Sequence, residues 1–340
     1  MRKLLAVDAG GTSTRAVLLD ATGRCLGLGL AGGGNPISSG IEGALASLEA
    51  AVRSAKSMAG TGSSTFAHAV MAMAGASAQT IPDQLAERLA GLGLTGKLVI
   101  EPDLLATFFS GTFHPEGYAL VAGTGAVAAR IGAGRLAAVA DGTGWLLGDE
   151  GSGYWIGHRV VRAVVAALDG RGPDTALTAG LLAALGIDPA STARSHGRPE
   201  AVQRLIKELY ALRPVELSRF APLAVAAVDD DVARLILDQA AAALARTLAA
   251  VGDETVPGPV VFGGSVLTAG PRLASAVQAS LPPALRRAGE PLLVADGVIG
   301  AAVLALRHAG MTVDRDVFDR IGETLEGLRR PRVPDAPGRR

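Results

Sequence analysis

The stretch LAVDAGGT at residues 5–12 decides the fold, because the chain repeats its pattern as ALVAGTG at residues 119–125. In each copy an apolar strand runs into a turn of glycine and threonine. Two further apolar runs follow each turn, at 14–19 and 25–31 in the first copy and at 126–131 and 135–140 in the second. A repeated strand–turn–strand–turn–strand unit predicts two related domains, each built on a β-meander.

Helices and further strands are expected between and after the meanders. Helical apolar spacing or small-residue runs predict helices at 40–59, 83–91, 104–110, 154–168, 177–185, 200–212, 232–250 and 297–308. Short apolar runs predict strands at 70–74, 97–101, 259–262 and 292–294. We expect an α/β protein with domains at 1–115 and 116–310, the final helix of the second being able to pack back on the first. A partly disordered extension, 311–340, follows, with a Pro- and Arg-rich tail from 329.

Composition excludes several classes of protein. The 340 residues carry a formal net charge of zero, so no basic surface for nucleic acid is indicated. No run of about 18 apolar residues exists, so no membrane span is expected. The N-terminal apolar run is broken too early, at Asp8, for a signal peptide, and a cytoplasmic protein is the default. Cys25 is the sole cysteine; it cannot form a disulfide or a zinc site within the chain, and a buried structural thiol is expected.

The first turn, DAGGTST at residues 8–14, has the composition of an anion site. Its backbone N–H groups can converge on an anion, and its hydroxyls add donors. Asp8 cannot bind phosphate itself, but it can hold a hydrated Mg²⁺ beside one. We therefore expect phosphate binding by four residues of this turn, Gly10, Gly11, Thr12 and Ser13. The alternative is a plain glycine-rich hairpin.

Two further glycine motifs extend this prediction. Gly123-Thr124-Gly125 is a second candidate phosphate loop, strengthened by its equivalent place in the repeat. Gly263-Gly264-Ser265 follows a predicted strand and precedes a helix. Adjacent glycines allow a flat ligand such as an adenine ring to lie against the backbone, although a helix cap or a turn explains the same motif.

These motifs, in this order, resemble the actin/hexokinase/Hsp70 ATPase superfamily, whose two domains share a ribonuclease H-like fold. The stretch GWLLGDEGSGYWIG at residues 144–157 more narrowly resembles the BadF/BadG/BcrA/BcrD ATPase family, in its N-acetylglucosamine kinase branch. The resemblance covers roughly residues 4–308. It implies ATP and Mg²⁺ as cofactors and an amino sugar as substrate, phosphorylated on its 6-hydroxyl.

The resemblance also implies roles for individual residues. Asp103, after the fifth strand, matches the base that activates the sugar hydroxyl; the alternative role of helix N-cap can coexist with it. Asn35 and Asp149 match sugar-binding residues, and Gly144, Trp145 and Gly153 belong to the same substrate stretch. Without the resemblance, Asn35 is interpreted as a turn residue, Asp149 as a loop acid and Trp145 as a core aromatic.

The sequence departs from the N-acetylglucosamine kinases at the second turn. Those kinases continue it with Ser-Asn, whereas this chain has Ala126-Val127, so glucosamine or another hexose stays open as the substrate. An activator ATPase of the same family would need cysteines for an iron–sulfur cluster, and Cys25 alone disfavours it. A non-catalytic sensor would not need Asp103. Sugar kinases of this class often pair, so a homodimer is one expectation.

Overall fold

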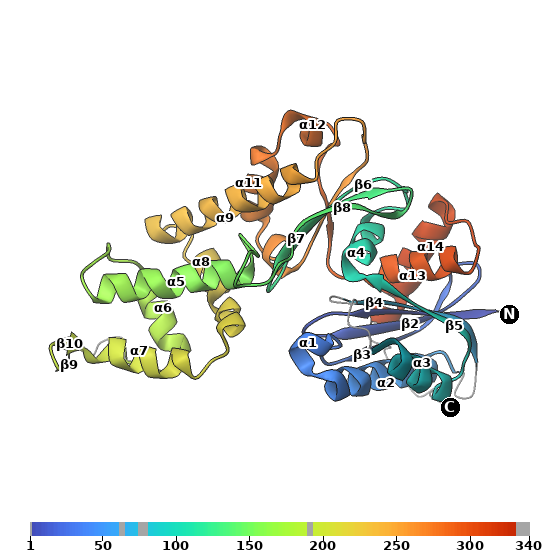
Figure 1. Ribbon diagram of the computed structural model, residues 1–340, viewed down its shortest axis with the longest axis horizontal. Helices are drawn as coiled ribbons and strands as arrows, with labels where there is room; N and C mark the ends of the chain where they lie inside the picture. The colour runs from blue at the N-terminus through green and yellow to red at the C-terminus, as the bar shows by residue number, and fades with distance from the viewer. Residues whose placement is uncertain (1, 61–64, 74–80, 189–192, 331–340) are drawn as a thin grey trace, which may run out of the picture. The chain divides into compact units, whose positions relative to one another are not determined.

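The computed structural model describes residues 2–60, 65–73, 81–188 and 193–330. They form two compact units (Figure 1). Unit 1 comprises Met1–His114 together with Asp296–Arg340, and unit 2 comprises Pro115–Ala295. The expected second domain ran to residue 310, with the alternative that its final helix packs back on the first; residues 296–310 belong to unit 1, as do 311–330 of the expected extension. Unit 1 is therefore built from both ends of the chain.

Unit 1 contains a five-stranded sheet in the order β3-β2-β1-β4-β5. Its strands are β1 (Lys3–Ala9), β2 (Thr14–Asp20), β3 (Cys25–Ala31), β4 (Phe66–Met73) and β5 (Leu94–Pro102). The first three form the antiparallel meander, while β4 runs parallel to β1 and β5 parallel to β4. The carboxyl ends of β1, β4 and β5 therefore meet at one edge of the sheet.

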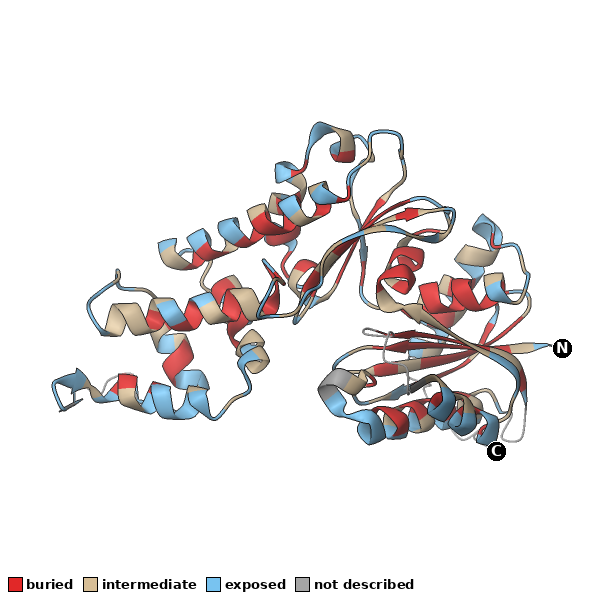
Figure 2. Ribbon diagram, viewed as in Figure 1, coloured by how far each residue is buried: buried red, intermediate tan, exposed pale blue. Residues whose placement is uncertain are grey.

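Helices cover the sheet of unit 1. They are α1 (Pro36–Ser39), α2 (Ile41–Met58), α3 (Ile81–Gly91), α4 (Asp103–Gly111), α13 (Val298–His308) and α14 (Arg315–Arg329). The α2 helix packs closely on β3, since a Cβ at Gly29 would lie 1.9 Å from the carbonyl oxygen of Ala51. The α13 helix packs against β1 and α4, and Figure 2 shows it buried along most of its length.

Unit 2 contains the second five-stranded sheet, in the order β12-β11-β6-β7-β8. Its strands are β6 (Gly117–Ala122), β7 (Ala126–Gly132), β8 (Arg135–Asp141), β11 (Val260–Gly263) and β12 (Leu292–Val294). The meander β6-β7-β8 is antiparallel, and β11 runs parallel to β6 and to β12. The two sheets thus repeat one plan, a three-stranded meander extended by two parallel strands.

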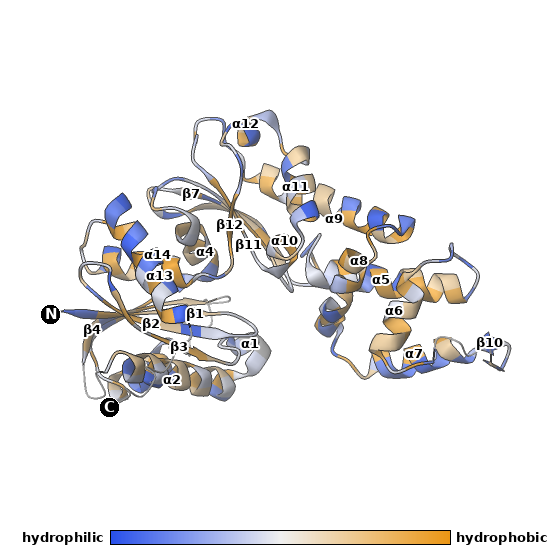
Figure 3. Cartoon of the chain, turned by 180° about the vertical axis from the view of Figure 1, so that it is seen from behind, coloured by the Kyte–Doolittle hydropathy of each residue, from blue (hydrophilic) through white to orange (hydrophobic). Residues whose placement is uncertain are grey.

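The rest of unit 2 is mainly helical. Its elements are α5 (Gly153–Leu168), α6 (Leu177–Ala184), α7 (Glu200–Tyr210), the 3₁₀ helix η1 (Pro214–Phe220), α8 (Ala221–Ala226), α9 (Asp231–Ala250), α10 (Ser265–Thr268), α11 (Pro271–Ser280), α12 (Pro283–Arg286) and the small hairpin β9 (Arg194–Ser195)–β10 (Arg198–Pro199). The α9 helix contacts the meander, and one apolar core joins sheet and helices. The α6 helix is coloured hydrophobic almost throughout in Figure 3.

Each strand and helix expected from the sequence is present, with ends shifted by a few residues. Residue 74 of the expected fourth strand and residues 331–340 of the expected tail lie outside the described part. The structure adds helices that the sequence reading did not predict, chiefly α11, α14 and the stretch from η1 to α8. Cys25 is buried, as expected. Among the described residues, no helix has the length and apolar character needed to cross a membrane.

Candidate functional site

The first turn is closed by its own backbone and supported by a neighbouring loop. Gly10 N–H donates to the Ser13 carbonyl at 2.9 Å, and Gly34 N–H donates to the Gly10 carbonyl at 2.9 Å. A Cβ at Gly33 would lie 2.5 Å from the Gly11 carbonyl oxygen, so glycine is needed for this close approach. The loop therefore brings Asn35 to the side of the turn, where Gly11 and Thr12 are exposed.

Asp8 lies at the end of β1, with an exposed fraction of 7%. Its Oδ2 accepts from Gly297 N–H at 3.0 Å and lies 3.7 Å from the Arg15 guanidinium. Burial raises the pKa of Asp8 to about 6; the Gly297 bond and Arg15 oppose this rise, while the carboxylates of Asp296 and Asp103 add to it. A cation would be stabilised beside this concentration of negative charge.

Mg²⁺ fits this chemistry, because a hard cation prefers carboxylate oxygens and water. Within the described residues, no three side chains of the metal-binding types lie close enough to form a protein-only site. The coordination of a metal at Asp8 would therefore be completed by water and by oxygens of a bound phosphate.

Asp103 follows β5 at the same sheet edge as Asp8. The register aligns Ala9 with Met73 and Met73 with Pro102, so β1, β4 and β5 end side by side. Asp103 is the first residue of α4, and its Oδ1 accepts from Leu104 N–H at 2.9 Å. The N-cap position belongs to Pro102, so the interpretation of Asp103 as the N-cap is wrong. Burial raises the pKa of Asp103.

The second turn is held by the start of α5. Gly153 N–H donates to the Gly123 carbonyl at 2.7 Å, and Tyr154 N–H donates to the Thr124 carbonyl at 3.1 Å. Within the turn, Gly123 N–H donates to the Gly125 carbonyl at 2.9 Å. These bonds fix the turn against the first residues of α5.

Gly264 also contacts this turn. It has a φ of +86° and caps α10, which begins at Ser265. A Cβ at Gly264 would lie 2.3 Å from the Ala122 carbonyl oxygen, so no other residue fits here without a backbone shift. Since β11 ends at Gly263 beside β6, the expected adenosine motif and the second turn lie together in unit 2.

Asp149 faces the second turn as well. Its exposed fraction is 9%, and its Oδ1 accepts from Ala126 N–H at 3.2 Å. A Cβ at Gly125 would lie 2.8 Å from Asp149 Oδ2, so the glycine makes room for this carboxylate. Burial raises the pKa of Asp149, and the charge of Asp141 adds to the rise. The loop acid of the sequence is thus a nearly buried carboxylate, set against the turn.

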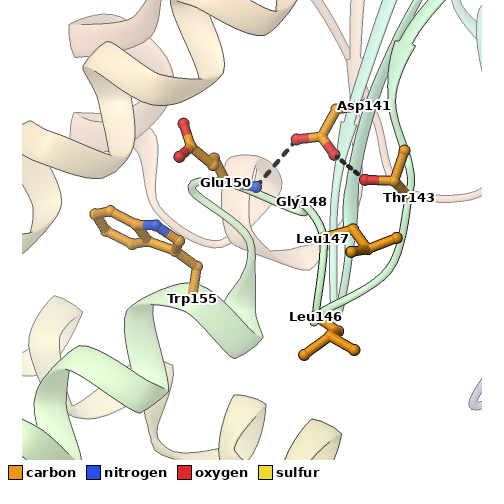
Figure 4. A pocket seen from close by; sticks show the side chains of 7 residues that line it. All are labelled: Asp141, Thr143, Leu146, Leu147, Gly148, Glu150 and Trp155. Atoms are coloured by element: carbon orange, nitrogen blue, oxygen red, sulfur yellow. Dashed lines mark hydrogen bonds between the residues drawn. The ribbon is translucent and has the colours of Figure 1, made fainter.

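Trp145 lies on the surface of the same loop. It is 40% exposed, and its ring meets the Tyr154 ring edge-to-face at 5.6 Å. It is therefore not a core aromatic. Gly144 precedes it with a φ of +86° and accepts from Gly148 N–H at 2.9 Å, which folds the loop back on itself. Beside this loop lies an open pocket of about 470 Å³ (Figure 4), lined by Asp141, Thr143, Leu146, Leu147, Gly148, Glu150 and Trp155.

The sequence reading missed four charged residues of these sites, Arg15, Asp296, Arg329 and Asp141. Arg15 Nε lies 3.3 Å from Asp296 Oδ2, and Arg329 lies 2.7 Å from the same oxygen. Asp141 binds the backbone of the Asp149 loop. The only sequence signal for Asp141 and Asp296 is that each precedes a glycine after a strand, a pair that is equally typical of an ordinary turn.

The structure thus gathers the predicted residues into two groups. Unit 1 holds Asp8, the first turn, Asn35 and Asp103 around the carboxyl edge of its sheet. Unit 2 holds the second turn, the adenosine motif, Asp149 and Gly153.

Comparison with known proteins identifies the family of this chain and several relatives. The model of the BadF/BadG/BcrA/BcrD ATPase family matches residues 5–305. The chain is 28% identical over 179 residues to a glucosamine kinase of Vibrio cholerae, covering 52% of this chain and 59% of the relative. It is 31% identical over 159 residues to an N-acetyl-D-glucosamine kinase of Dictyostelium discoideum, covering 45% and 46% respectively. The chain thus matches about half the length of these curated relatives.

A crystal structure has the same fold. A provisionally assigned N-acetylglucosamine kinase of Chromobacterium violaceum superposes with a TM-score of 0.69 at 25% identity, covering 90% of this chain and 99% of that one. This likeness confirms the expected fold class, a two-domain α/β fold of the actin-like ATPase type.

Proposed function

We propose, from the premise that the chain belongs to the BadF/BadG/BcrA/BcrD ATPase family, that it is an ATP-dependent sugar kinase. The reaction moves the γ-phosphoryl group of ATP to the 6-hydroxyl of an amino sugar. N-acetylglucosamine is the first candidate substrate, and glucosamine or another hexose is the alternative. Relatives named for both amino sugars support this substrate class.

One observation carries the proposal: two carboxylates, buried Asp8 near the end of β1 and half-buried Asp103 directly after β5, lie at one edge of a sheet whose strands run parallel there. Phosphoryl transfer needs little covalent help from a protein, so catalysis consists of positioning and charge compensation. Asp103 accepts a hydrogen bond from the acceptor hydroxyl, orients its oxygen toward the γ-phosphorus and takes its proton. Its raised pKa suits a group that must gain a proton during the reaction.

Asp8 takes the second role in unit 1. Mg²⁺, when bound, neutralises the charge on the phosphate oxygens, and Asp8 would hold it through water. The turn binds phosphate oxygens through the N–H groups of Gly11, Thr12 and Ser13 and the hydroxyls of Thr12 and Ser13, while Gly10 shapes the turn by donating its N–H to the Ser13 carbonyl. Arg15 keeps the Asp8 side chain in place through its pairing with both Asp8 and Asp296.

In unit 2, two motifs take nucleotide-binding roles. Gly123, Thr124 and Gly125 bind phosphate, while Gly263, Gly264 and Ser265 border the nucleoside. Gly264 packs directly against the backbone of Ala122 and Gly123. This closeness supports a common ligand for the two motifs.

Sugar binding is assigned to Asn35 in unit 1 and, in unit 2, to Asp149 with the residues Gly144, Trp145 and Gly153. Asp149 accepts hydrogen bonds from sugar hydroxyls while its Oδ1 is oriented by Ala126 N–H. The apolar side chains of Ala126 and Val127 offer no hydrogen bond where the N-acetylglucosamine kinases have Ser-Asn, so we expect the chain to recognise hydroxyls more strongly than the acetamido group.

A substrate panel tests the proposal. Purified protein is given MgATP with N-acetylglucosamine, glucosamine, N-acetylmuramic acid, glucose or N-acetylmannosamine, and ADP release is followed together with the sugar phosphate. At least one amino sugar should raise ADP release far above the rate without sugar, and EDTA should abolish it. Equal ADP release with and without every sugar would refute a sugar kinase.

A further inference from the structure

Asp141 ends β8 and binds the backbone of the loop that carries Asp149. Its Oδ1 accepts from Asp149 N–H at 2.7 Å, and its Oδ2 accepts from Glu150 N–H at 3.1 Å. Figure 4 shows the carboxylate reaching across to this segment from the end of the strand. Both oxygens of one side chain therefore hold consecutive peptide groups, and one of these groups belongs to a proposed sugar-binding residue.

The backbone here is in a conformation that needs support. Asp149 has a φ of +57°, in the left-handed region that residues with a Cβ seldom adopt, and Asp141 itself has a φ of +62°. Such conformations persist where surrounding contacts enforce them, and they gather at functional sites. Hydrogen bonds to a carboxylate are stronger than those to a neutral acceptor, so Asp141 is suited to enforce this one.

Gly148 makes the approach of Asp141 possible. A Cβ at this position would lie 2.2 Å from Asp141 Oδ1 and 2.2 Å from Thr143 Oγ1. The φ of Gly148 is not in the left-handed region, so closeness to the carboxylate is the reason that glycine is needed.

On its other side, Asp149 is fixed by the second turn. The Asp149 Oδ1 accepts from Ala126 N–H, and Gly125 leaves room for the carboxylate. The Asp149 side chain is thus fixed at its carboxylate by the N–H groups of Ala126 and Gly144, and through its backbone by Asp141.

We propose that Asp141 is a positioning residue for Asp149: by holding the Asp149 and Glu150 peptides, it keeps the Asp149 carboxylate in the orientation that binds the sugar. The sugar-binding role of Asp149 rests on the proposed function. The clamp, by which we mean the hydrogen bonds of Asp141 to the Asp149 and Glu150 peptides, can be tested without it.

The kinetic test compares Asp141→Asn with the wild type. An amide has one acceptor oxygen, so the variant loses one of the two peptide contacts. We expect kcat/KM for the sugar to fall about 100-fold, the order of loss for a misplacement of about 1 Å, while KM for ATP stays unchanged. Asp230→Asn is the matched control, because Asp230 likewise accepts from two backbone N–H groups of unit 2, those of Ala176 and Ala233, away from the loop.

A double-mutant cycle separates positioning from general loss of structure. If Asp141 acts through Asp149, Asp141→Asn should lower kcat/KM by no more than about twofold in an Asp149→Asn background, because non-additivity marks residues that act together. An undiminished loss in that background would overturn the proposal.

Two readouts do not depend on catalysis. Hydrogen exchange at one of the two amides, Asp149 or Glu150, should quicken at least tenfold in Asp141→Asn and stay unchanged in Asp230→Asn, since Asn can accept from only one of them. The chain has two tryptophans, and both, Trp145 and Trp155, lie at or beside this loop. Their fluorescence should therefore become more accessible to acrylamide in the same variant.

Gly148→Ala tests the proposal a second way and serves if Asp141→Asn does not fold. The new methyl group would displace the carboxylate that is still present, so it should reproduce the faster exchange and the lower kcat/KM for the sugar. Wild-type exchange in both variants would overturn the role of Asp141. A wild-type protein that phosphorylates no sugar would overturn the proposed function alone, while the exchange result would still decide on the clamp.

Discussion

At the residue scale, Asp8 is a carboxylate kept in a place that opposes its ionisation. It is buried, and the carboxylates of Asp296 and Asp103 act on it in the same direction as burial. The rise of its pKa from 3.8 to about 6 corresponds to roughly 3 kcal/mol of unfavourable free energy for the ionised form. The unliganded fold therefore holds at neutral pH a charge that a bound cation would stabilise.

Asp8→Asn should accordingly stabilise the unliganded protein at neutral pH. Because the folded-state pKa is raised, the contribution of Asp8 to stability is complete below about pH 4 and is lost as the pH rises through about 6. The free energy of unfolding of the variant, relative to wild type, should increase by up to about 3 kcal/mol between pH 4 and pH 7. Urea unfolding at several pH values measures this, and a constant difference across the range would contradict it.

Asp103→Asn tests the proposed base at the same scale. The amide keeps the size of the side chain and an acceptor for Leu104 N–H, but it cannot take a proton. We expect turnover to fall by about 10²–10⁴-fold, the usual contribution of general base catalysis, while sugar binding measured by calorimetry stays within a few fold. Turnover near the wild-type rate would show that another group is the base.

Residues of the site were predictable where they stand in a local motif. Asp8, the glycine turns and Asp103 each follow a strand that the sequence reveals by its apolar run, and the parallel register then brings the strand ends together. Arg15, Asp141 and Asp296 act through contacts between segments far apart in sequence or on opposite sides of a loop. No local pattern encodes such contacts, and so sequence reading missed them.

At the element scale, α13 and α4 approach so closely that only glycine fits at their crossing. A Cβ at Gly300 would lie 1.8 Å from the Ala106 carbonyl oxygen, and Gly300 N–H donates to Ser110 Oγ at 2.8 Å. The crossing also sets Gly297 against Asp8. The helix that carries Asp103 and the peptide that binds Asp8 are thus held in one packed pair.

Gly300→Ala should separate these helices. The methyl group meets backbone, which cannot rotate away, so a loss of about 3 kcal/mol in the free energy of unfolding is expected, at the upper end for overpacking. Gly322→Ala in α14 is the control, because no atom lies within 4 Å of its Cβ position; helix propensity should make it more stable by about 0.5–1 kcal/mol. Thermal unfolding monitored by circular dichroism compares them, and equal stabilities would refute the argument.

The α14 helix was within reach of sequence reasoning. Asp314 caps it by accepting from Val317 N–H, and Ile321 and Leu325, four residues apart, are its buried residues. A charged composition beside a Pro- and Arg-rich tail concealed this narrow apolar stripe. The strands of the two meanders were easier to predict, because a glycine-containing turn follows each of them.

At the scale of the whole molecule, unit 1 is assembled from the two ends of the chain and unit 2 from its middle. The α13 helix supplies a largely buried layer to the unit 1 sheet, and Thr324 of α14 accepts from Cys25 N–H at 3.0 Å. The helix that ends the expected second domain thus packs on the first, the alternative that the sequence left open; a small-residue helix carries no sequence mark of the sheet on which it packs.

Fragments that correspond to the two units should therefore differ in their ability to fold alone. Residues 115–295 should fold alone with a cooperative thermal transition, since their core is continuous in sequence. Residues 1–114 should lack such a transition, because β1 would expose the apolar surface that α13 covers, and joining 296–330 to them by a flexible linker should restore it. Circular dichroism and calorimetry check both, and a cooperative 1–114 fragment would contradict this view of unit 1.

The late arrival of α13 has a consequence for the order of events on the ribosome. The chain emerges from its beginning, yet the layer that completes the first unit is made only after Pro115–Ala295 has been translated. At about 5–20 residues per second, the early strands wait on the order of ten to forty seconds for their cover. We expect the middle of the polypeptide to reach its native state first, leaving the nascent N-terminal sheet as the part that chaperones shield.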